Sequence, residues 1–274
     1  NDGTSVTLAS YTFTINQVND EPTLTVTSAN PTFTEDGSAV ALYSSAAATD
    51  GGDAGSQTIS EVTITVTNVA DTTETLTVDG TGITLAASQS GTTSTNSLSY
   101  AVTGCSTTCT LALTSGTLTM AQLQTMVDAM TYSNSDQSPT HTPNRVVTIT
   151  TIKDSGGTSP GDDSAAVNRV STVDLVAAQD LPTTGDQTIS GTEDVVDMYA
   201  SGDFTFADVD GDTITHVKIT TLESAGTLFY DTDGGDDFDA GEDVTLNQII
   251  AIGNIANLGF VGASNANGNS YATF

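Results

Sequence analysis

Alternation of apolar residues with threonine is the strongest structural signal in this chain. In residues 61–67, Val62, Ile64 and Val66 alternate with polar residues, mostly threonine. A strand turns successive side chains to opposite faces, so this period of two buries one face and leaves the other in water. The pattern recurs in residues 147–149, 173–175 and 11–15. Because Gly, Asn, Asp and Ser separate these runs, we expect an all-β chain of antiparallel β-sandwiches.

Residues 118–130 instead have a helical period. The apolar stripe consists of Met120, Leu123, Val127 and Met130, and Thr119 occupies the N-cap position. We therefore expect one short inserted helix near residues 119–130. We interpret its stripe as a plug over an open edge of the sandwich core; the alternative is a binding groove.

Two junctions of similar sequence divide the chain. Val18-Asn19-Asp20-Glu21-Pro22 recurs as Ala178-Gln179-Asp180-Leu181-Pro182, and Thr-Glu-Asp follows each, at 34–36 and 192–194. Two landmarks in one order indicate tandem domains of related design. We expect terminal strands in residues 1–20, a β-sandwich in residues 21–179 and a second β-sandwich in residues 180–274. The second has expected strands at 204–206, 214–219 and 228–230, and a final strand at 271–274 that leaves it incomplete.

The charge balance excludes two classes of partner. The chain has 34 acidic and 4 basic residues, a formal net charge of −30. Such a surface repels nucleic-acid phosphates and anionic lipid headgroups, and no apolar run reaches the roughly 18 residues of a membrane helix. Charged residues make up only 14% of the chain, which argues against disorder. We therefore interpret the clustered acids as ligands and expect neither nucleic-acid binding nor direct membrane insertion.

The two cysteines, Cys105 and Cys109, lie four residues apart with no histidine or second cysteine pair nearby. This spacing indicates a disulfide that closes a hairpin, rather than a metal site. Two free thiols are the alternative. Because the closed loop is short, the bond would add little stability compared with a long-range bridge.

Closely spaced aspartates indicate calcium sites. Asp208, Asp210 and Asp212 stand at alternate positions, and Gly211 allows a turn that folds them around one ion. Calcium takes six to eight oxygen ligands, which loops of this kind supply. The alternative is a polar turn of unbound aspartates, which would crowd like charges.

Residues 231–243 partly follow the spacing of an EF-hand loop. The acidic residues at its positions 1, 3, 7, 9 and 12 are Asp231, Asp233, Asp237, Asp239 and Glu242. Position 6, which requires Gly, is Asp236, and no helices are expected on either side. The sequence therefore predicts calcium binding without an EF-hand.

Several motifs together resemble a known family. They are NDEP at 19–22, TED at 192–194, FADVDGDT at 206–213 and NGNSYATF at 267–274. In this order they look like the repeats of bacterial cadherin-like and VCBS-type domains, which occur in tandem in giant secreted adhesins, including RTX-type adhesins. The second domain matches best, and the first resembles a longer relative. The resemblance implies tandem Ig/cadherin-like β-sandwiches.

The resemblance also implies calcium ions between domains. The implied ligands are Asp20 or Asp180 with Glu35, Asp36, Glu193 and Asp194. Without metal these acids repel one another and the joint swings, whereas with metal the array stiffens. For Glu193 and Asp194 the alternative is that they cap a turn.

In such repeats, a strand like residues 271–274 is followed by a strand pair that residues 1–20 resemble. Either the chain is one period of a longer polypeptide, or its N-terminal strand completes the sandwich of a neighbouring copy, as in donor-strand fibres. The expected partners are accordingly copies of the chain itself or adjacent repeats of a longer chain.

The expected function is structural: a calcium-rigidified repeat of a secreted bacterial adhesin or extracellular filament. The alternative is a calcium-dependent module that binds surface glycans or proteins. Catalysis is not expected, because His141 and His216 lie in no nucleophile or metal motif. The chain also has 5% aromatic residues and no Trp with which to line a sugar cleft.

Overall fold

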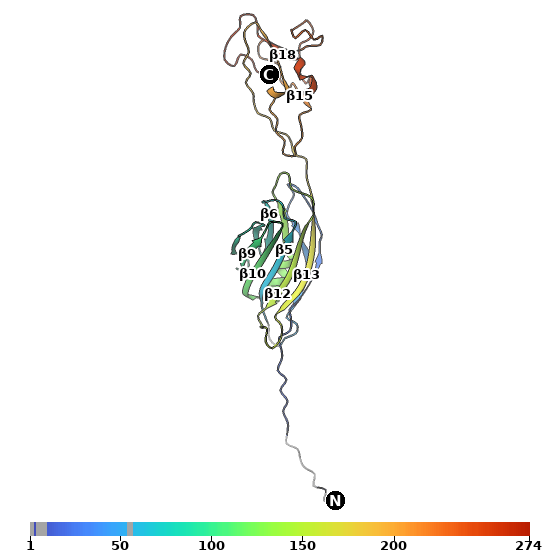
Figure 1. The fold of residues 1–274 in the computed structure, drawn as a ribbon, viewed down its shortest axis with the longest axis vertical. Helices are drawn as coiled ribbons and strands as arrows, with labels where there is room; N and C mark the ends of the chain where they lie inside the picture. Colours follow the sequence, from blue (N-terminus) through green and yellow to red (C-terminus); the bar gives the residue numbers. More distant parts are fainter. Residues whose placement is uncertain (1–2, 4–9, 54–56) are drawn as a thin grey trace. The chain divides into compact units, whose positions relative to one another are not determined.

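The computed structural model describes residue 3, residues 10–53 and residues 57–274. The chain forms two compact units, Asn1–Ala178 (unit 1) and Gln179–Phe274 (unit 2). Strands dominate unit 1, and unit 2 has short strands joined by long loops (Figure 1). Strand residues far outnumber helical ones, so the predicted all-β class is confirmed. No helix in the described part of the chain is long and apolar enough to cross a membrane.

Unit 1 is built around a seven-stranded sheet. Across this sheet the strands are β2 (Thr32–Thr34), β13 (Ser164–Val176), β12 (Arg145–Asp154), β5 (Ile59–Thr67), β10 (Thr108–Leu118), β9 (Ser99–Gly104) and β8 (Ser90–Thr92). All neighbours are antiparallel except β2 and β13. The strands predicted around Val62, Val147 and Val173 are β5, β12 and β13, and β5, β10, β12 and β13 lie side by side in Figure 1.

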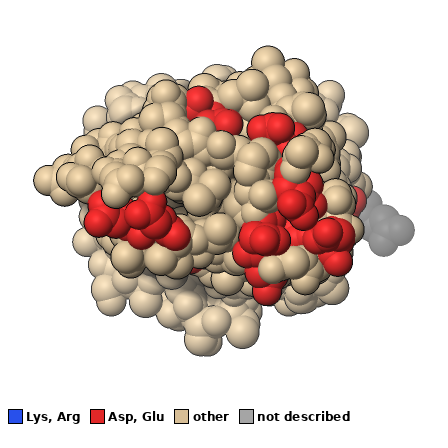
Figure 2. Space-filling model, turned by 90° about the horizontal axis from the view of Figure 1, so that it is seen from above, with Lys and Arg blue, Asp and Glu red and all other residues tan. Residues whose placement is uncertain are grey.

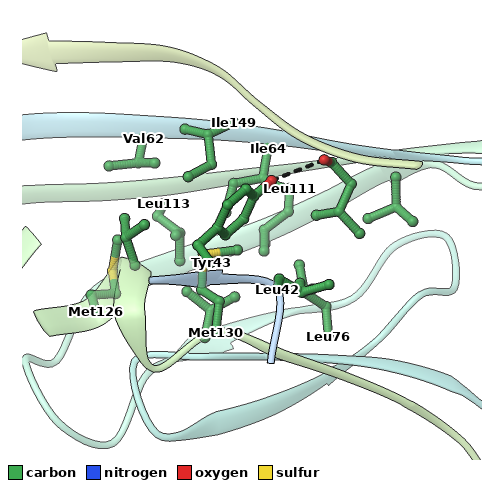
Figure 3. Close-up of a cluster of buried hydrophobic side chains, with 14 of the residues drawn as sticks. Leu42, Tyr43, Val62, Ile64, Leu76, Leu111, Leu113, Met126, Met130 and Ile149 are labelled. Atoms are coloured by element: carbon green, nitrogen blue, oxygen red, sulfur yellow. Dashed lines mark hydrogen bonds between the residues drawn. The ribbon is translucent and has the colours of Figure 1, made fainter. Parts of the chain in front are cut away.

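A second layer covers this sheet. It contains β3 (Val40–Ala41), β11 (Thr131–Asn134), β6 (Glu74–Val78) and β7 (Thr81–Thr84), with β1 (Thr23–Ser28) and β4 (Tyr43–Thr49) as a separate pair. Figure 3 shows the core between the layers: Val62, Ile64, Leu111, Leu113 and Ile149 face Leu42, Tyr43, Leu76, Met126 and Met130. The alternation in the sequence places the apolar side chains here and turns the threonines away.

The Tyr43 hydroxyl is a polar group within this core, and it is hydrogen-bonded there. The Tyr43 hydroxyl donates to the carbonyl oxygens of Val147 at 2.9 Å and Arg169 at 3.0 Å. Both carbonyls belong to the large sheet, so this side chain connects the two layers. Burial raises the pKa of the Tyr43 hydroxyl far above its usual range, which keeps it a neutral donor.

The predicted helix is α1 (Met120–Asp128), and it lies against β4. Thr119 is its N-cap: the Thr119 side chain accepts from the Gln122 N–H, and the Gln122 side chain accepts from the Thr119 N–H. Leu123 and Val127 are buried as predicted, while Met120 is only half-buried. Met126, which was not assigned to the stripe, is also buried. The apolar face is therefore filled by core contacts, as a plug requires.

The disulfide joins Cys105 and Cys109, whose Cα atoms lie 4.2 Å apart. These residues flank the turn between β9 and β10, where the Cys105 N–H also donates to the Thr108 carbonyl at 2.7 Å. The bond therefore closes a hairpin that already has its own backbone hydrogen bond.

A buried ion network lies at one end of unit 1. Arg145 is fully buried on β12, and its guanidinium contacts Glu74 at 2.9 Å and Asp71 at 3.2 Å. Glu74 also accepts from the Tyr132 hydroxyl at 2.9 Å and from the backbone N–H groups of Ala70 and Asp71. This many donors satisfy a carboxylate that would otherwise be costly to bury.

Unit 2 has shorter strands. One sheet orders β14 (Val196–Met198), β18 (Leu258–Val261) and β16 (Thr227–Tyr230), and a second pairs β15 (His216–Lys218) with β17 (Ile249–Ala251). Two 3₁₀ helices, η1 (Ser201–Asp203) and η2 (Ile252–Asn257), complete the elements. The buried apolar cluster consists of Tyr199, Ile219, Leu228, Val244, Ile250, Ile255 and Leu258.

Two strands expected in unit 2 and one expected near the start of the chain do not form. At 204–206, the Thr205 hydroxyl accepts from the Gly185 N–H and donates to the Gly185 carbonyl, and the Thr184 hydroxyl donates to the Thr205 carbonyl. These side-chain hydrogen bonds take the place of the backbone hydrogen bonds of a β-ladder. At 271–274, Thr273 forms hydrogen bonds with Ser224, and no strand pairing is present among the residues that the structure describes. Residues 10–18 are exposed and have no strand partner among the described residues; residues 1–2 and 4–9, also expected to contain terminal strands, lie outside the described part.

The buried network yields a stability prediction. Arg145→Met keeps an unbranched side chain but leaves Glu74 buried without its cation. We expect the free energy of unfolding of unit 1 to fall by about 3–5 kcal/mol, measured by urea denaturation. Lys153→Met removes the same charge from a partly exposed ion pair with Asp163 and should cost about 1 kcal/mol. Equal losses in the two variants would contradict a structural role for the network.

Candidate metal centre

Three carboxylates converge in the loop that follows β16. Asp231, Asp233 and Glu242 each place a carboxylate oxygen within 4.8 Å of the others. Asp231 and Glu242 are buried, and Asp233 is exposed. All three were predicted from the spacing in residues 231–243. In the described part of the chain, no other group of His, Cys, Asp or Glu side chains meets this distance.

Backbone hydrogen bonds position the two buried carboxylates. Asp231 accepts from the N–H groups of Asp233, Gly234 and Asp236 at 2.7 to 3.0 Å. Gly234 has φ +87°, a conformation that favours glycine and lets the chain fold around the Asp231 carboxylate. The hydrogen bonds from Gly234 and Asp236 hold the pKa of Asp231 below its usual range. The loop thus keeps this group ionised.

Glu242 closes the loop from its far end. The Glu242 carboxylate accepts from the Thr232 N–H at 2.7 Å, the Thr232 hydroxyl at 2.9 Å and the Asp239 N–H at 3.0 Å. The backbone hydrogen bonds from Thr232 and Asp239 lower the pKa of Glu242. Two ionised carboxylates are therefore fixed next to each other.

The other two predicted ligands of this loop remain outside the group of three. Asp237 and Asp239 are exposed. Repulsion from Asp237, and then from Asp233, raises the pKa of Asp239. The carboxylates of this loop therefore carry an electrostatic cost that they do not relieve among themselves. Oxygen-only donors at this spacing fit a hard divalent cation such as Ca²⁺, which Asp231, Asp233 and Glu242 would hold.

The predicted ligands near residue 210 also come together in unit 2. Asp210 accepts from the Asp180 N–H at 2.6 Å and from the Gln179 side chain at 2.9 Å, and Asp212 also accepts from Gln179 at 2.9 Å. The Asp212 N–H donates to Asp208, whose second oxygen is buried and has no hydrogen-bond partner among the described residues. Gly211 has φ +82°, as the predicted turn requires.

Glu193 and Asp194 lie elsewhere in unit 2. Asp194 accepts from the Asn265 N–H at 2.9 Å, and Glu193 is exposed. The turn containing them is closed by a bond from the Val195 N–H to the Thr192 carbonyl at 3.3 Å. Asp194 therefore contacts a residue other than those that surround Asp180.

In unit 1, Asp20 and Glu35 lie at opposite ends of β13. Asn19, beside Asp20, forms a bridge with Gly161, just before β13 begins. Glu35 accepts from the Ala178 N–H, just after β13 ends. A strand of 13 residues spans about 40 Å, so Asp20 and Glu35 cannot share one ion within this unit. Asp36, next to Glu35, is exposed and accepts from the Gln137 side chain at 2.8 Å.

The surroundings of Asp20 contain acids that sequence reasoning missed. Asp53 accepts from the Asp20 N–H at 3.2 Å and from Gln57 at 2.7 Å. The adjacent Asn19 amide contacts Asp154 at 3.3 Å and the carbonyls of Gly157 and Asp162. Asp154 is only 2% exposed, and one of its oxygens has no hydrogen-bond partner in the described part of the chain. Asp154 and Asn19 are 135 residues apart in the sequence, so no spacing motif joins them. The one sequence signal for this contact is that Asp154 is an acidic residue at the end of an expected strand.

The wider surface offers few cations to balance these acids. On the face shown in Figure 2, Asp and Glu side chains form separate groups and no Lys or Arg is visible.

The sequence matches no protein-family model, no curated protein and no solved structure.

The cluster of three yields a binding prediction. Asp231→Asn replaces one carboxylate oxygen with an amide NH₂ and removes one negative charge. We expect the affinity for Ca²⁺, measured by isothermal titration calorimetry, to fall at least about tenfold. Asp186→Asn makes the same charge change at an exposed position of unit 2 and should leave the affinity unchanged. An equal effect of both variants would show that only net charge matters.

Proposed function

We propose that this chain is a structural repeat of a secreted bacterial adhesin or extracellular filament, and that calcium at its acidic loops rigidifies its β-sandwich units. The single observation that carries the proposal is the convergence of Asp231, Asp233 and Glu242, two of them buried, within 4.8 Å. Without a cation, burying like charges at this distance costs free energy. A divalent ion would turn this cost into a bond between the two ends of the loop.

The distribution of basic residues supports this role. The chain has only 4 Lys and Arg residues. Among the described residues, the ion pairs are those of Arg145 with Asp71 and Glu74 and of Lys153 with Asp163. These pairs leave the carboxylates of the 231–242 loop without a basic side chain. A cation from solution is therefore the remaining source of positive charge for this loop.

The proposed role is structural rather than catalytic. His141 and His216 are exposed and belong to different units, His141 in a loop of unit 1 and His216 on β15. The acids of the 231–242 loop are bound to their own backbone, which fixes the loop. An extracellular location would supply the calcium and is part of the same proposal.

Calcium removal tests the proposal directly. We expect unit 2 to melt about 10 °C higher in saturating Ca²⁺ than in EDTA, because a ligand at 100 times its Kd adds about 2.7 kcal/mol. Differential scanning calorimetry measures this shift, and small-angle scattering should show a broader range of conformations in EDTA. Asp231→Asn should lose most of the shift and Asp186→Asn should keep it. Identical melting and scattering in Ca²⁺ and EDTA would reject the proposed function.

A further inference from the structure

Phe229 on β16 is buried on the side of its sheet that faces away from the main apolar cluster of unit 2. Its neighbours Leu228 and Tyr230 pack in that cluster, and successive side chains of a strand point to opposite faces. Phe229 is nevertheless 0% exposed. Its ring lies across Gly259 of β18, where a Cβ atom would come within 2.5 Å of the ring. A group outside the main cluster must therefore cover the outer side of Phe229.

Phe238 covers Phe229 from the acidic loop. The centroids of the two rings are 5.7 Å apart and their planes are tilted by 56°, a favourable geometry for an aromatic pair. The Phe238 side chain is 36% exposed, so most of its surface is packed against the protein. Phe238 is also the one large apolar residue in the sequence of residues 231–242. The loop thus has a single apolar side chain, and that side chain contacts the sheet.

The ring contact is a third attachment of the loop to β16. The two ends of the loop are attached by backbone hydrogen bonds: the Tyr230 N–H donates to the Glu242 carbonyl at 2.8 Å, and the Val244 N–H donates to the Leu228 carbonyl at 3.1 Å. Phe238 lies between these ends. It therefore fixes the part of the loop that the strand ends do not hold directly.

The acidic neighbours of Phe238 oppose this contact. Phe238 stands between Asp237 and Asp239, and repulsion from Asp237 and then Asp233 raises the pKa of Asp239. Like charges lower their energy by moving apart, which would lift residues 237–239 away from the sheet. Removal of the Phe238 ring from water acts in the other direction. The closed form of the loop therefore depends on this one apolar contact.

The backbone connects Phe238 to the buried carboxylates. The N–H of Asp239, the next residue, donates to the Glu242 carboxylate at 3.0 Å, and the Thr232 N–H donates to the same carboxylate at 2.7 Å. A loop that lifted at residues 237–239 would withdraw the Asp239 donor and leave Glu242 freer to turn away from Asp231. The ring contact thus helps to hold the two buried carboxylates side by side.

We propose that Phe238 is a positioning residue for the candidate cation site: by packing on Phe229, it keeps the loop closed so that Asp231, Asp233 and Glu242 are already together when an ion arrives. This inference rests on the proposed calcium role and adds to it a residue that does not touch the ion. A loop that is ordered in advance binds more tightly than one that the ion must order, because less conformational entropy is lost on binding.

The first test measures calcium binding by the full chain with isothermal titration calorimetry. Phe238→Ala should weaken Ca²⁺ binding about tenfold, because the ion must then order the loop. Phe238→Leu keeps an apolar side chain and should stay within about threefold of the unaltered chain. The matched control is Phe204→Ala, which removes a ring that packs against the main cluster of unit 2. It should also leave the affinity within about threefold, although it removes apolar contacts from the same unit.

The second test examines the loop without any metal. Hydrogen exchange is followed by NMR in EDTA, with the amides of Thr232 and Asp239 as reporters because both donate to Glu242. In Phe238→Ala these amides should exchange at least about tenfold faster, since local opening exposes them. The amides of β16 and β18 should keep their exchange rates, and Phe238→Leu should resemble the unaltered chain.

Each measurement can overturn the proposal. Unchanged calcium affinity or unchanged loop exchange in Phe238→Ala would do so. An equal loss of affinity in Phe204→Ala, or faster exchange throughout unit 2, would show that Phe238 only contributes to general packing.

The two tests also separate this inference from the proposed function. An unaltered chain that binds no Ca²⁺ would reject the proposed function, and exchange in EDTA would still decide whether Phe238 closes the loop. Calcium binding that is equally tight in Phe238→Ala and in the unaltered chain would reject the positioning role alone.

Discussion

The structure depends on how a chain with so few cations accommodates its carboxylates. Three arrangements appear. Glu74 is buried against Arg145, a permanent cation. Asp79 is buried without one and is instead held by the Thr93 hydroxyl and by the Asn96 backbone and side-chain N–H groups. The third arrangement is the 231–242 loop, where N–H groups fix the carboxylates but do not cancel their mutual repulsion. The proposed calcium role follows from this remaining repulsion.

Much of the fold of unit 1 could be predicted from local pattern. Strands such as β5 carry their alternation in sequence, and α1 carries both an apolar period and a capping box. Local pattern could not predict which strands lie next to each other in the sheets. The parallel contact of β2 with β13 joins residues about 140 positions apart, and a three-residue strand has too little period to detect. The strand expected at 204–206 failed for the related reason that hydrogen bonds from Thr205 compete with a ladder.

The candidate sites show the same contrast between residues that are close in the sequence and residues that are far apart. Asp231, Asp233 and Glu242 belong to one loop, so their spacing alone indicates that they can meet. The group around Asp154 was missed because the β12–β13 hairpin and the chain near Asn19 bring it together, and no spacing rule spans that distance. Asp237 and Asp239 also fall at ligand positions of an EF-hand, but both are exposed and lie outside the group of three.

The two units differ in what holds them together. The core of unit 1 draws apolar side chains from both layers of its sandwich, so hydrophobic burial dominates its stability. Unit 2 has strands of three or four residues around a small buried cluster, and its long loops must be ordered by other means. In the 231–242 loop the hydrogen bonds go to ionised acceptors, which are stronger than neutral ones but persist only while the charges are tolerated. The order of this loop is thereby linked to whatever compensates those charges, whereas Glu74 in unit 1 has its compensating cation, Arg145, within the fold.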